Sequence, residues 1–144
     1  MIRAILFSAA LVASCVGVLL SVVPTAAGGD DSKDRVFEMR TYHTLEGRLP
    51  ALNKRFREHT IELFKKHGIE SIAYYTPLDE KDGKSNKLVY ILAYPSKEAA
   101  TKSWEAFRND PEWKKAQAAS EADGKIVAKV ESVFLNPTDY SAIK

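Results

Sequence analysis

The stretch RVFEMRTYHT, residues 35–44, decides how the fold is read, because its residues alternate in character as they do along a β-strand. One set of alternate residues is largely apolar: Phe37, Met39 and Thr41. The other set brings an acid, a guanidinium and a phenol to the opposite side of the strand: Val36, Glu38, Arg40 and Tyr42. Successive side chains of a strand point to opposite faces of the sheet. The fold must therefore provide a surface on which Glu38, Arg40 and Tyr42 lie side by side.

Residues 1–27 have the features of a signal peptide. Arg3 precedes the apolar run Ala4–Val23, and Pro24 is followed by small residues that suit a signal peptidase. We therefore expect cleavage and an exported protein, periplasmic or secreted. Two alternatives stay open. The first alternative is an uncleaved N-terminal membrane anchor, because the length of the apolar run is close to the roughly 20 residues that span a bilayer. Lipidation of Cys15 is the second.

Composition limits the rest of the chain to one domain and excludes some partners. Residues 28–34 predict a flexible linker, residues 35–136 one domain and residues 137–144 a C-terminal tail. Without Arg3 the chain has 20 basic and 19 acidic residues, a net charge of +1. Such a balance produces no long-range field, so no nucleic acid partner is expected. Cys15 is the only cysteine, so the exported chain would contain no disulfide.

Hydrophobic periodicity and turn residues predict elements in the order β-α-β-β-α-β. Strands are expected at residues 35–42, 69–76, 87–94 and 125–135, and helices at residues 47–67 and 96–123. Within the second helix, Asp110 and Pro111 predict a break and a restart, because Asp caps helices and Pro suits a first turn. This order indicates an α+β, ferredoxin-like subunit with helices on one face of a four-stranded antiparallel sheet.

The strand expected at residues 87–94, KLVYILAY, is apolar on both sides. A sheet with helices on one face would leave one of these rows in water, although burying a single Leu or Tyr stabilises a protein by on the order of 1.5–3 kcal/mol. Soluble monomers avoid exposed apolar patches of this kind. We therefore expect a homodimer in which a second copy covers the open sheet face and completes a dimeric α+β barrel.

Three segments resemble the NIPSNAP domain, a member of the dimeric α+β barrel superfamily. They are FEMRTYHTLEGRLPALNKRFREHTIELFKKHGI, LVYILAYPSKEAA and FRNDPEWKKA, and the resemblance covers residues 36–135. The resemblance implies a ferredoxin-like subunit that dimerises through its sheet. Animal members have been linked to mitochondria and vesicle traffic, whereas bacterial exported members have no settled activity. The export signal separates this chain from the organellar members.

Arg40 is the central candidate for a functional residue. We expect its row to face the inside of the barrel beside Lys129 and Glu131, and an enclosed guanidinium must be paired. Its partner is either a neighbouring acid, in a salt bridge that only fixes the barrel, or a small anionic or aromatic ligand. The predicted ligand-binding residues are Glu38, Arg40, Tyr42, Tyr74 and Tyr90.

Two functions from different classes follow. The first is an exported, non-catalytic homodimer that binds a small hydrophobic or aromatic/anionic molecule in or near the barrel. The second is suggested by enzymes of the superfamily that the chain resembles. It is a cofactor-independent monooxygenase or cyclase acting on an aromatic or polyketide-like substrate, in which Tyr42 or His43 moves a proton and Arg40 stabilises negative charge.

Neither a metal nor another cofactor is expected. His59 and His67 are eight residues apart on one predicted helix, about 12 Å at 1.5 Å per residue, which is too far to share a metal. Residues 96–123 contain no histidine for a haem, and the chain has no phosphate-binding glycine loop. His59 is interpreted as a packed histidine in the apolar stripe of its helix. The larger aromatic residues, Trp104, Phe107 and Trp113, are interpreted as core or interface anchors in preference to a ligand-binding box.

Overall fold

The strand built from RVFEMRTYHT, β1 (Val36–Thr44), is an interior strand of the sheet. The computed structural model describes residues 35–144, so the predicted leader and linker lie outside the described residues. The sheet is antiparallel with the strand order β2-β3-β1-β4. Its other strands are β2 (Glu70–Tyr75), β3 (Lys87–Tyr94) and β4 (Val127–Leu135). The predicted strands agree with these bounds to within two residues at each end.

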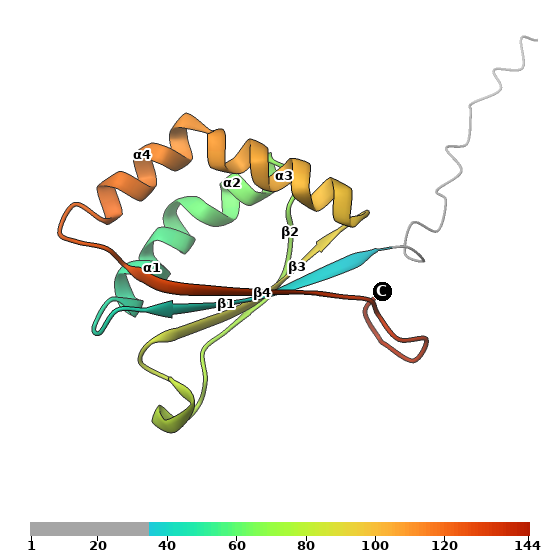
Figure 1. Cartoon of the computed structure of the whole chain (residues 1–144), viewed down its shortest axis with the longest axis horizontal. Coiled ribbons are helices and arrows are strands. Elements are labelled where there is room, and N and C mark those ends of the chain that lie inside the picture. Colours follow the sequence, from blue (N-terminus) through green and yellow to red (C-terminus); the bar gives the residue numbers. More distant parts are fainter. Residues whose placement is uncertain (1–34) are drawn as a thin grey trace, which may run out of the picture.

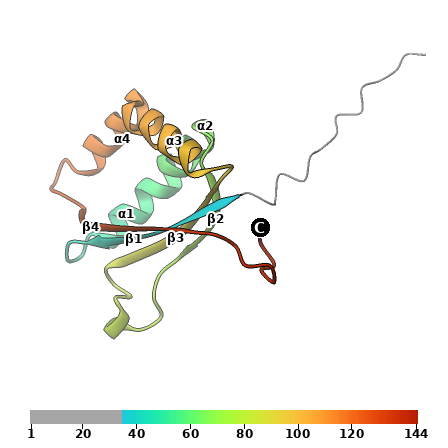
Figure 2. The same cartoon turned by 45° about the vertical axis from the view of Figure 1, so that its right-hand side comes forward.

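The helices cover one face of this sheet (Figures 1 and 2). The first helical stretch consists of α1 (Leu49–Arg55), the π-helical turn η2 (Phe56–Thr60) and α2 (Ile61–Lys66). The second consists of α3 (Lys97–Asn109) and α4 (Pro111–Ser120), and a 3₁₀ turn, η3 (Glu80–Asp82), lies in the β2–β3 loop. The α+β, ferredoxin-like fold predicted from the sequence is confirmed. Among residues 35–144, no helix has the length and apolar character needed to cross a bilayer.

The second helical stretch starts and breaks where capping residues predict. The Ser96 hydroxyl accepts a hydrogen bond from the Ala99 backbone N–H at 3.1 Å, which caps α3. At the break, one oxygen of Asp110 accepts from the Glu112 N–H at 2.7 Å, and Pro111 opens α4. The other oxygen of Asp110 lies 2.6 Å from Nε2 of His67. Asp110 therefore ties the break in the second helical stretch to the end of α2.

The π-helical turn η2 changes which side of the first helical stretch faces the core. A π turn adds one residue to a helical turn, so the side chains after it move around the helix axis. Thr60 is consequently buried, and its hydroxyl donates to the Arg55 carbonyl at 3.2 Å. His59, by contrast, is exposed. The interpretation of His59 as a packed histidine is therefore wrong, because it assumed an unbroken 3.6-residue period.

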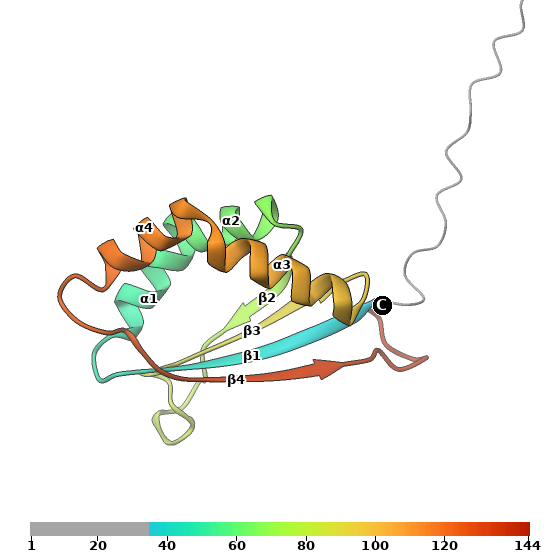
Figure 3. The same ribbon diagram turned by 45° about the horizontal axis from the view of Figure 1, so that its top comes forward.

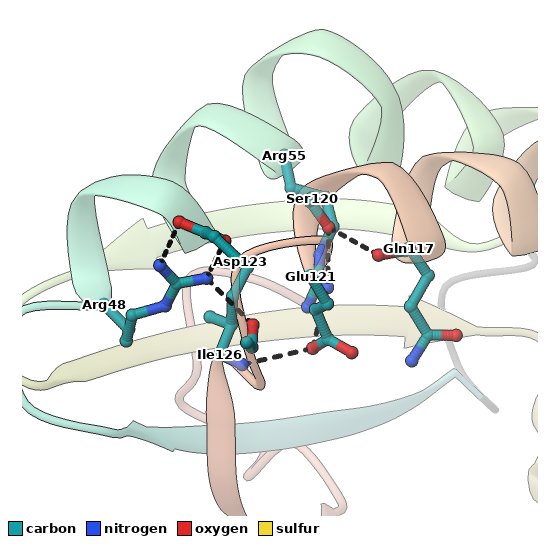
Figure 4. A network of polar contacts seen from close by, with 8 residues as sticks. Arg48, Arg55, Gln117, Ser120, Glu121, Asp123 and Ile126 are labelled. Carbon is teal, nitrogen blue, oxygen red and sulfur yellow. Dashed lines mark hydrogen bonds and ion pairs between the residues drawn. The ribbon is translucent and has the colours of Figure 1, made fainter.

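Two arginines fix the start of β4, Arg48 just before α1 and Arg55 at the end of α1 (Figure 4). Arg48 donates two hydrogen bonds to Asp123, at 2.7 and 2.6 Å, and a third to the Gly124 carbonyl at 2.9 Å. The buried Arg55 guanidinium reaches Glu121 at 3.3 Å, and the same Glu121 oxygen accepts from the backbone N–H at the buried Ile126. The chain leaving α4 is therefore held in place before it enters the sheet beside β1.

The face of the sheet away from the helices is apolar over much of its area. β1, β3 and β4 contribute neighbouring side chains to it: Phe37, Met39, Val89, Ile91, Val133 and Leu135. The tail after β4 folds over part of this face and leaves a hollow of about 340 Å³. β4 is the least covered strand, since Val133 remains 49% exposed on this face and Val130 41% exposed on the helix side. The subunit alone therefore leaves apolar surface uncovered.

Candidate functional site

The polar row of β1 faces the helices. Glu38, Arg40 and Tyr42 pair across the sheet with Leu92, Tyr90 and Leu88, which are core residues of β3 under the helical layer. The expectation that this row lines the inside of a barrel is therefore wrong. Lys129 and Glu131 are not its neighbours either, because they pair with His43 and Thr41 on the open face. The sequence suggested the opposite arrangement because polar side chains usually avoid a helix-covered face. The alternation within a strand does not reveal that hydrogen-bond donors from other elements lie on that face.

Glu38 is the centre of the buried network and is 1% exposed. One carboxylate oxygen accepts from Arg40 Nη1 and from the Ser132 hydroxyl, both at 2.5 Å. The other accepts from the Trp104 indole N–H at 2.7 Å and from the Tyr94 hydroxyl at 3.0 Å. Four donors from β1, β3, β4 and α3 thus converge on a single side chain. A buried carboxylate with four partners is fully satisfied and fixes the positions of all of them.

This network keeps Glu38 ionised. Burial by itself raises the pKa of a carboxyl, but the hydrogen bonds from Ser132 and Trp104 and the charge of Arg40 outweigh burial and lower the pKa of Glu38 below its ordinary value. Burial acts to lower the pKa of Arg40, but neighbouring Tyr90, Tyr42 and Glu38 raise it, so the guanidinium stays charged. The site therefore contains a permanent ion pair at neutral pH.

Arg40 is oriented by this ion pair and by stacking. Its Nε donates to the Tyr90 hydroxyl at 3.1 Å, and its guanidinium carbon lies 4.2 Å from the centre of the Trp104 ring. Cation–π contact of this kind stabilises a guanidinium that has lost part of its hydration. Among the described residues, Arg40 Nη2 makes no hydrogen bond to protein. One end of a rigid, partly buried cation is therefore free for a ligand.

A groove of about 360 Å³ opens beside Arg40, between β1 and the second helical stretch. Its walls are aromatic and cationic, and its lining residues are Arg40, Tyr42, Trp104, Phe107, Arg108, Trp113, Lys114 and Gln117. Three of these residues carry positive charge, and none of the eight is acidic. Both tryptophans of the chain belong to this set. The groove can therefore hold a small anion with a flat body, because the cations attract charge and the aromatic rings offer π surfaces.

The predicted ligand-binding residues divide into two groups. Arg40 and Tyr42 line the groove, whereas Glu38 and Tyr90 lie behind it, with Tyr90 0% exposed. Tyr74 stacks on Tyr90 with ring centres 5.6 Å apart, and burial raises its pKa. It is not a lining residue of the groove. Burial also raises the pKa of Tyr90 well above its ordinary value. Glu38 and Tyr90 therefore support the groove from inside the core, and Tyr74 packs against the core beside Tyr90.

The candidate proton-transfer residues are separated by the sheet. Tyr42 lines the groove, whereas His43 points to the open face, where its Nε2 lies 3.3 Å from Glu131. His43 therefore cannot act on a molecule in this groove. Trp104 and Phe107 are buried, as expected of core anchors, and Trp113 is half-buried with its ring 4.5 Å from that of Phe107. All three also line the groove, so the two interpretations are not exclusive.

Arg108, Lys114 and Gln117 were not predicted from the sequence. They lie on either side of the helix break at Asp110, and the direction of α4 after that break brings them over β1. Helical spacing alone gave no sign of this arrangement, because all three are exposed residues on polar helix faces. Within residues 35–144 there is no group of three His, Cys, Asp or Glu side chains placed to hold a metal ion.

We expect Glu38→Gln to destabilise the subunit by roughly 3 kcal/mol or more. In either orientation the amide N–H group would meet an obligate donor, the Arg40 guanidinium or the Trp104 indole, and the Arg40 charge would lose its partner. Urea unfolding followed by circular dichroism measures the effect. Glu70→Gln is the control, because Glu70 pairs with Arg35 at 2.9 Å but is 59% exposed, and it should cost no more than about 1 kcal/mol. Similar small losses for both variants would contradict the central role of Glu38.

Comparisons with known proteins agree with this fold. The NIPSNAP family model matches residues 37–142, which is most of the chain. No curated protein sequence matched the chain. A NIPSNAP family protein with unknown function (Atu4242) from Agrobacterium tumefaciens is similar in structure, with 24% sequence identity and a TM-score of 0.66, over 78% of this chain and 96% of that one.

Two further solved structures show the same fold at lower identity. A NIPSNAP family protein (Atu5224) from Agrobacterium tumefaciens has 19% identity and a TM-score of 0.66, over 76% of this chain and 99% of that one. An uncharacterized NIPSNAP-like domain protein from Burkholderia xenovorans has 16% identity and a TM-score of 0.65, over 76% of this chain and 90% of that one. Because the family model covers residues 37–142, the chain belongs to the NIPSNAP family.

Proposed function

We propose that this NIPSNAP protein is an exported homodimer that binds a small aromatic or anionic molecule in the groove beside Arg40. The observation that carries the proposal is the lining of the groove, where three cations and several aromatic rings meet without an acid. The whole chain has a net charge of only +2, so this concentration of positive charge is local. A site of this composition favours an organic carboxylate over a neutral molecule of the same shape.

The geometry assigns different tasks to the lining residues. Arg40 is rigid and partly buried, so its free Nη2 suits a directed hydrogen bond to one carboxylate oxygen. Lys114 is exposed at the rim, where an ammonium group on a flexible stem attracts charge with less directional preference. The rings of Tyr42 and Trp113 provide partly exposed aromatic surface for a flat ligand body.

We expect the protein to bind 4-nitrobenzoate about tenfold or more tightly than 4-nitrobenzamide, because a hydrogen bond to a charged group contributes about 1.5–3 kcal/mol. Nitroaromatic compounds quench tryptophan fluorescence, and both tryptophans line the groove, so quenching reports occupancy directly. Lys114→Ala should reduce this preference several-fold. Lys102→Ala, an exposed α3 lysine outside the groove, is the matched control. Equal affinity for the acid and the amide would contradict the proposed ligand class.

The dimer part of the proposal rests on the open sheet face. Apolar side chains of β1, β3 and β4 lie together there, and Val133 and Leu135 are 49% and 40% exposed in a single subunit. A second copy of the same face, related by a two-fold axis, would cover this surface with a complementary one.

We expect Val133→Glu to convert a dimer into a monomer at micromolar concentration, as measured by light scattering. The new carboxylate would be desolvated between the two sheets without a partner, whereas in a single subunit the position is half-exposed and tolerates charge. Circular dichroism should therefore be unchanged. Thr101→Glu, at an exposed position of α3, should leave the dimer intact. A wild-type monomer would contradict the proposed assembly.

A second candidate function is a cofactor-independent monooxygenase or cyclase acting on an aromatic or polyketide-like substrate. It is favoured by the position of Tyr42, whose ring lies 5.7 Å from the guanidinium carbon of Arg40 within the same groove. In this function Tyr42 would transfer a proton while Arg40 stabilised an enolate or carboxylate. Native mass spectrometry of the purified protein, repeated after incubation in air with any molecule that co-purifies, separates the two functions, because a binding protein would leave that molecule unchanged and an enzyme would convert it.

Export is supported by the leader features of residues 1–27. The same mass measurement tests it, since cleavage would shorten the chain by about the length of a signal peptide. An intact N-terminus would instead favour the membrane anchor.

A further inference from the structure

The exposed tip of the β2–β3 loop suggests a contribution to the groove from the second subunit. Leu78 lies in this loop and is 84% exposed, although loop tips are normally polar. On the helix side of β4, Val130 pairs with the groove residue Tyr42 and is 41% exposed, and Phe134 pairs with Glu38 and is 36% exposed. The fold of one subunit thus leaves apolar side chains uncovered at two separate places.

The loop is ordered by its own hydrogen bonds. The backbone N–H groups of Asp82 and Lys84 donate to the Asp79 carbonyl at 3.1 and 3.2 Å, and the Ser85 hydroxyl donates to Glu80 at 2.8 Å. Gly83 has a φ of +100°, a conformation that glycine adopts without strain, and a Cβ there would lie 2.6 Å from Asn86 Oδ1. A preorganised loop loses little entropy on docking. It projects from the side of the sheet opposite the helices (Figures 1 and 3).

The open face has two chemically different ends. The end with Phe37, Ile91 and Leu135 is apolar and is partly covered by the tail after β4, and the Arg35–Glu70 ion pair lies beside it. The end next to the β2–β3 loop carries His43, Lys129 and Glu131. A two-fold axis parallel to the strands places apolar end on apolar end, whereas an axis across the strands places apolar on charged. The first arrangement avoids burying unpaired charge against apolar side chains and is favoured.

That axis determines which edges of the two sheets meet. Because the strand order is β2-β3-β1-β4, turning one copy over about an axis parallel to the strands places its β2 edge opposite the β4 edge of the other copy. The β2–β3 loop lies at the end of the sheet where His43 pairs with Lys87 and with Lys129. Val130 is the next residue of β4. The loop of one subunit therefore comes to the β4 edge of the other. Because the loop projects away from its own helices, it points past this edge toward the helix side of the partner's sheet, where Val130 and the groove lie.

The charges at the two places are complementary. The tip segment 78–82 contains Asp79, Glu80 and Asp82 against one lysine, a net charge of −2. The groove has three cations and no acid, and two of these cations, Arg108 and Lys114, are exposed. Attraction between the tip and these exposed cations would fix the register of docking. Arg40, which is less exposed, would remain available to the ligand.

We propose that the β2–β3 loop of each subunit closes the β4 side of the partner's groove, with Leu78 packed against Val130 and the acidic tip facing the exposed cations. The inference rests on the proposed homodimer and deepens it, because the groove would be complete only in the dimer. Each subunit would then provide both a groove and the closing loop of the other groove, as two-fold symmetry requires.

Disulfide cross-linking of Leu78→Cys/Val130→Cys tests the proposal, in the full chain carrying Cys15→Ser to remove its only native cysteine. Leu78 is in the loop that follows β2 and projects from the open side of the sheet, whereas Val130 is on β4 and faces the helix side. The β2 and β4 edges are three strand spacings of about 4.8 Å apart, and a disulfide needs Cα atoms within about 7 Å. A cross-link must therefore join two subunits. The controls are the two single-cysteine variants and the pair Leu78→Cys/Thr101→Cys, whose second position is on α3.

We expect a covalent dimer on non-reducing gels for the Leu78/Val130 pair and little for the controls, with light scattering showing a dimer before oxidation. A dimer that fails to cross-link above the control pair would overturn the loop docking and leave the proposed assembly standing. A monomer by light scattering would overturn both. Because Leu78 and Val130 are exposed in a single subunit, circular dichroism of the variants should match the wild type.

Discussion

The structure depends on one buried carboxylate. Glu38 is 1% exposed and accepts hydrogen bonds from Arg40, Ser132, Tyr94 and Trp104, so it joins three strands to α3. Placing a charge under a helical layer is costly unless every lone pair is satisfied. Once its lone pairs are satisfied, the Glu38 carboxylate holds each donor in one position. Apolar contacts are less directional and would fix these side chains less precisely.

The candidate site follows from this constraint. Glu38 does not line the groove, but it holds Arg40 and Trp104, which do. Arg40 lies over the Trp104 ring and keeps Nη2 free, so a rigid cation and an aromatic wall are in place before a ligand binds. Such preorganisation reduces the entropy lost on binding. The buried network and the candidate groove thus share Arg40 and Trp104, so a change in the network alters the groove.

The sequence predicted the elements well and the orientation of β1 poorly. Alternation in RVFEMRTYHT, the Ser96 cap and the Asp110–Pro111 break each reflect local chemistry, and the structure contains all three. The face to which Glu38 and Arg40 point depends instead on donors distant in the chain, such as the Trp104 indole, which local patterns do not reveal. The exposure of His59 was missed for a similar reason. The π turn adds a residue to the helix there, and nothing in the local sequence marks that insertion.

The most direct test of the account is an NMR titration of the Glu38 side-chain carboxyl carbon in the folded protein. Burial alone would raise its pKa, so a pKa below the ordinary glutamate range of about 4.3 would show that the hydrogen bonds from Ser132, Trp104 and Arg40 and the Arg40 charge dominate. In that case Glu38 stabilises the fold above its ordinary pKa, and this stabilisation is lost as the pH falls through the lowered value. A pKa at or above the ordinary range would contradict the central claim.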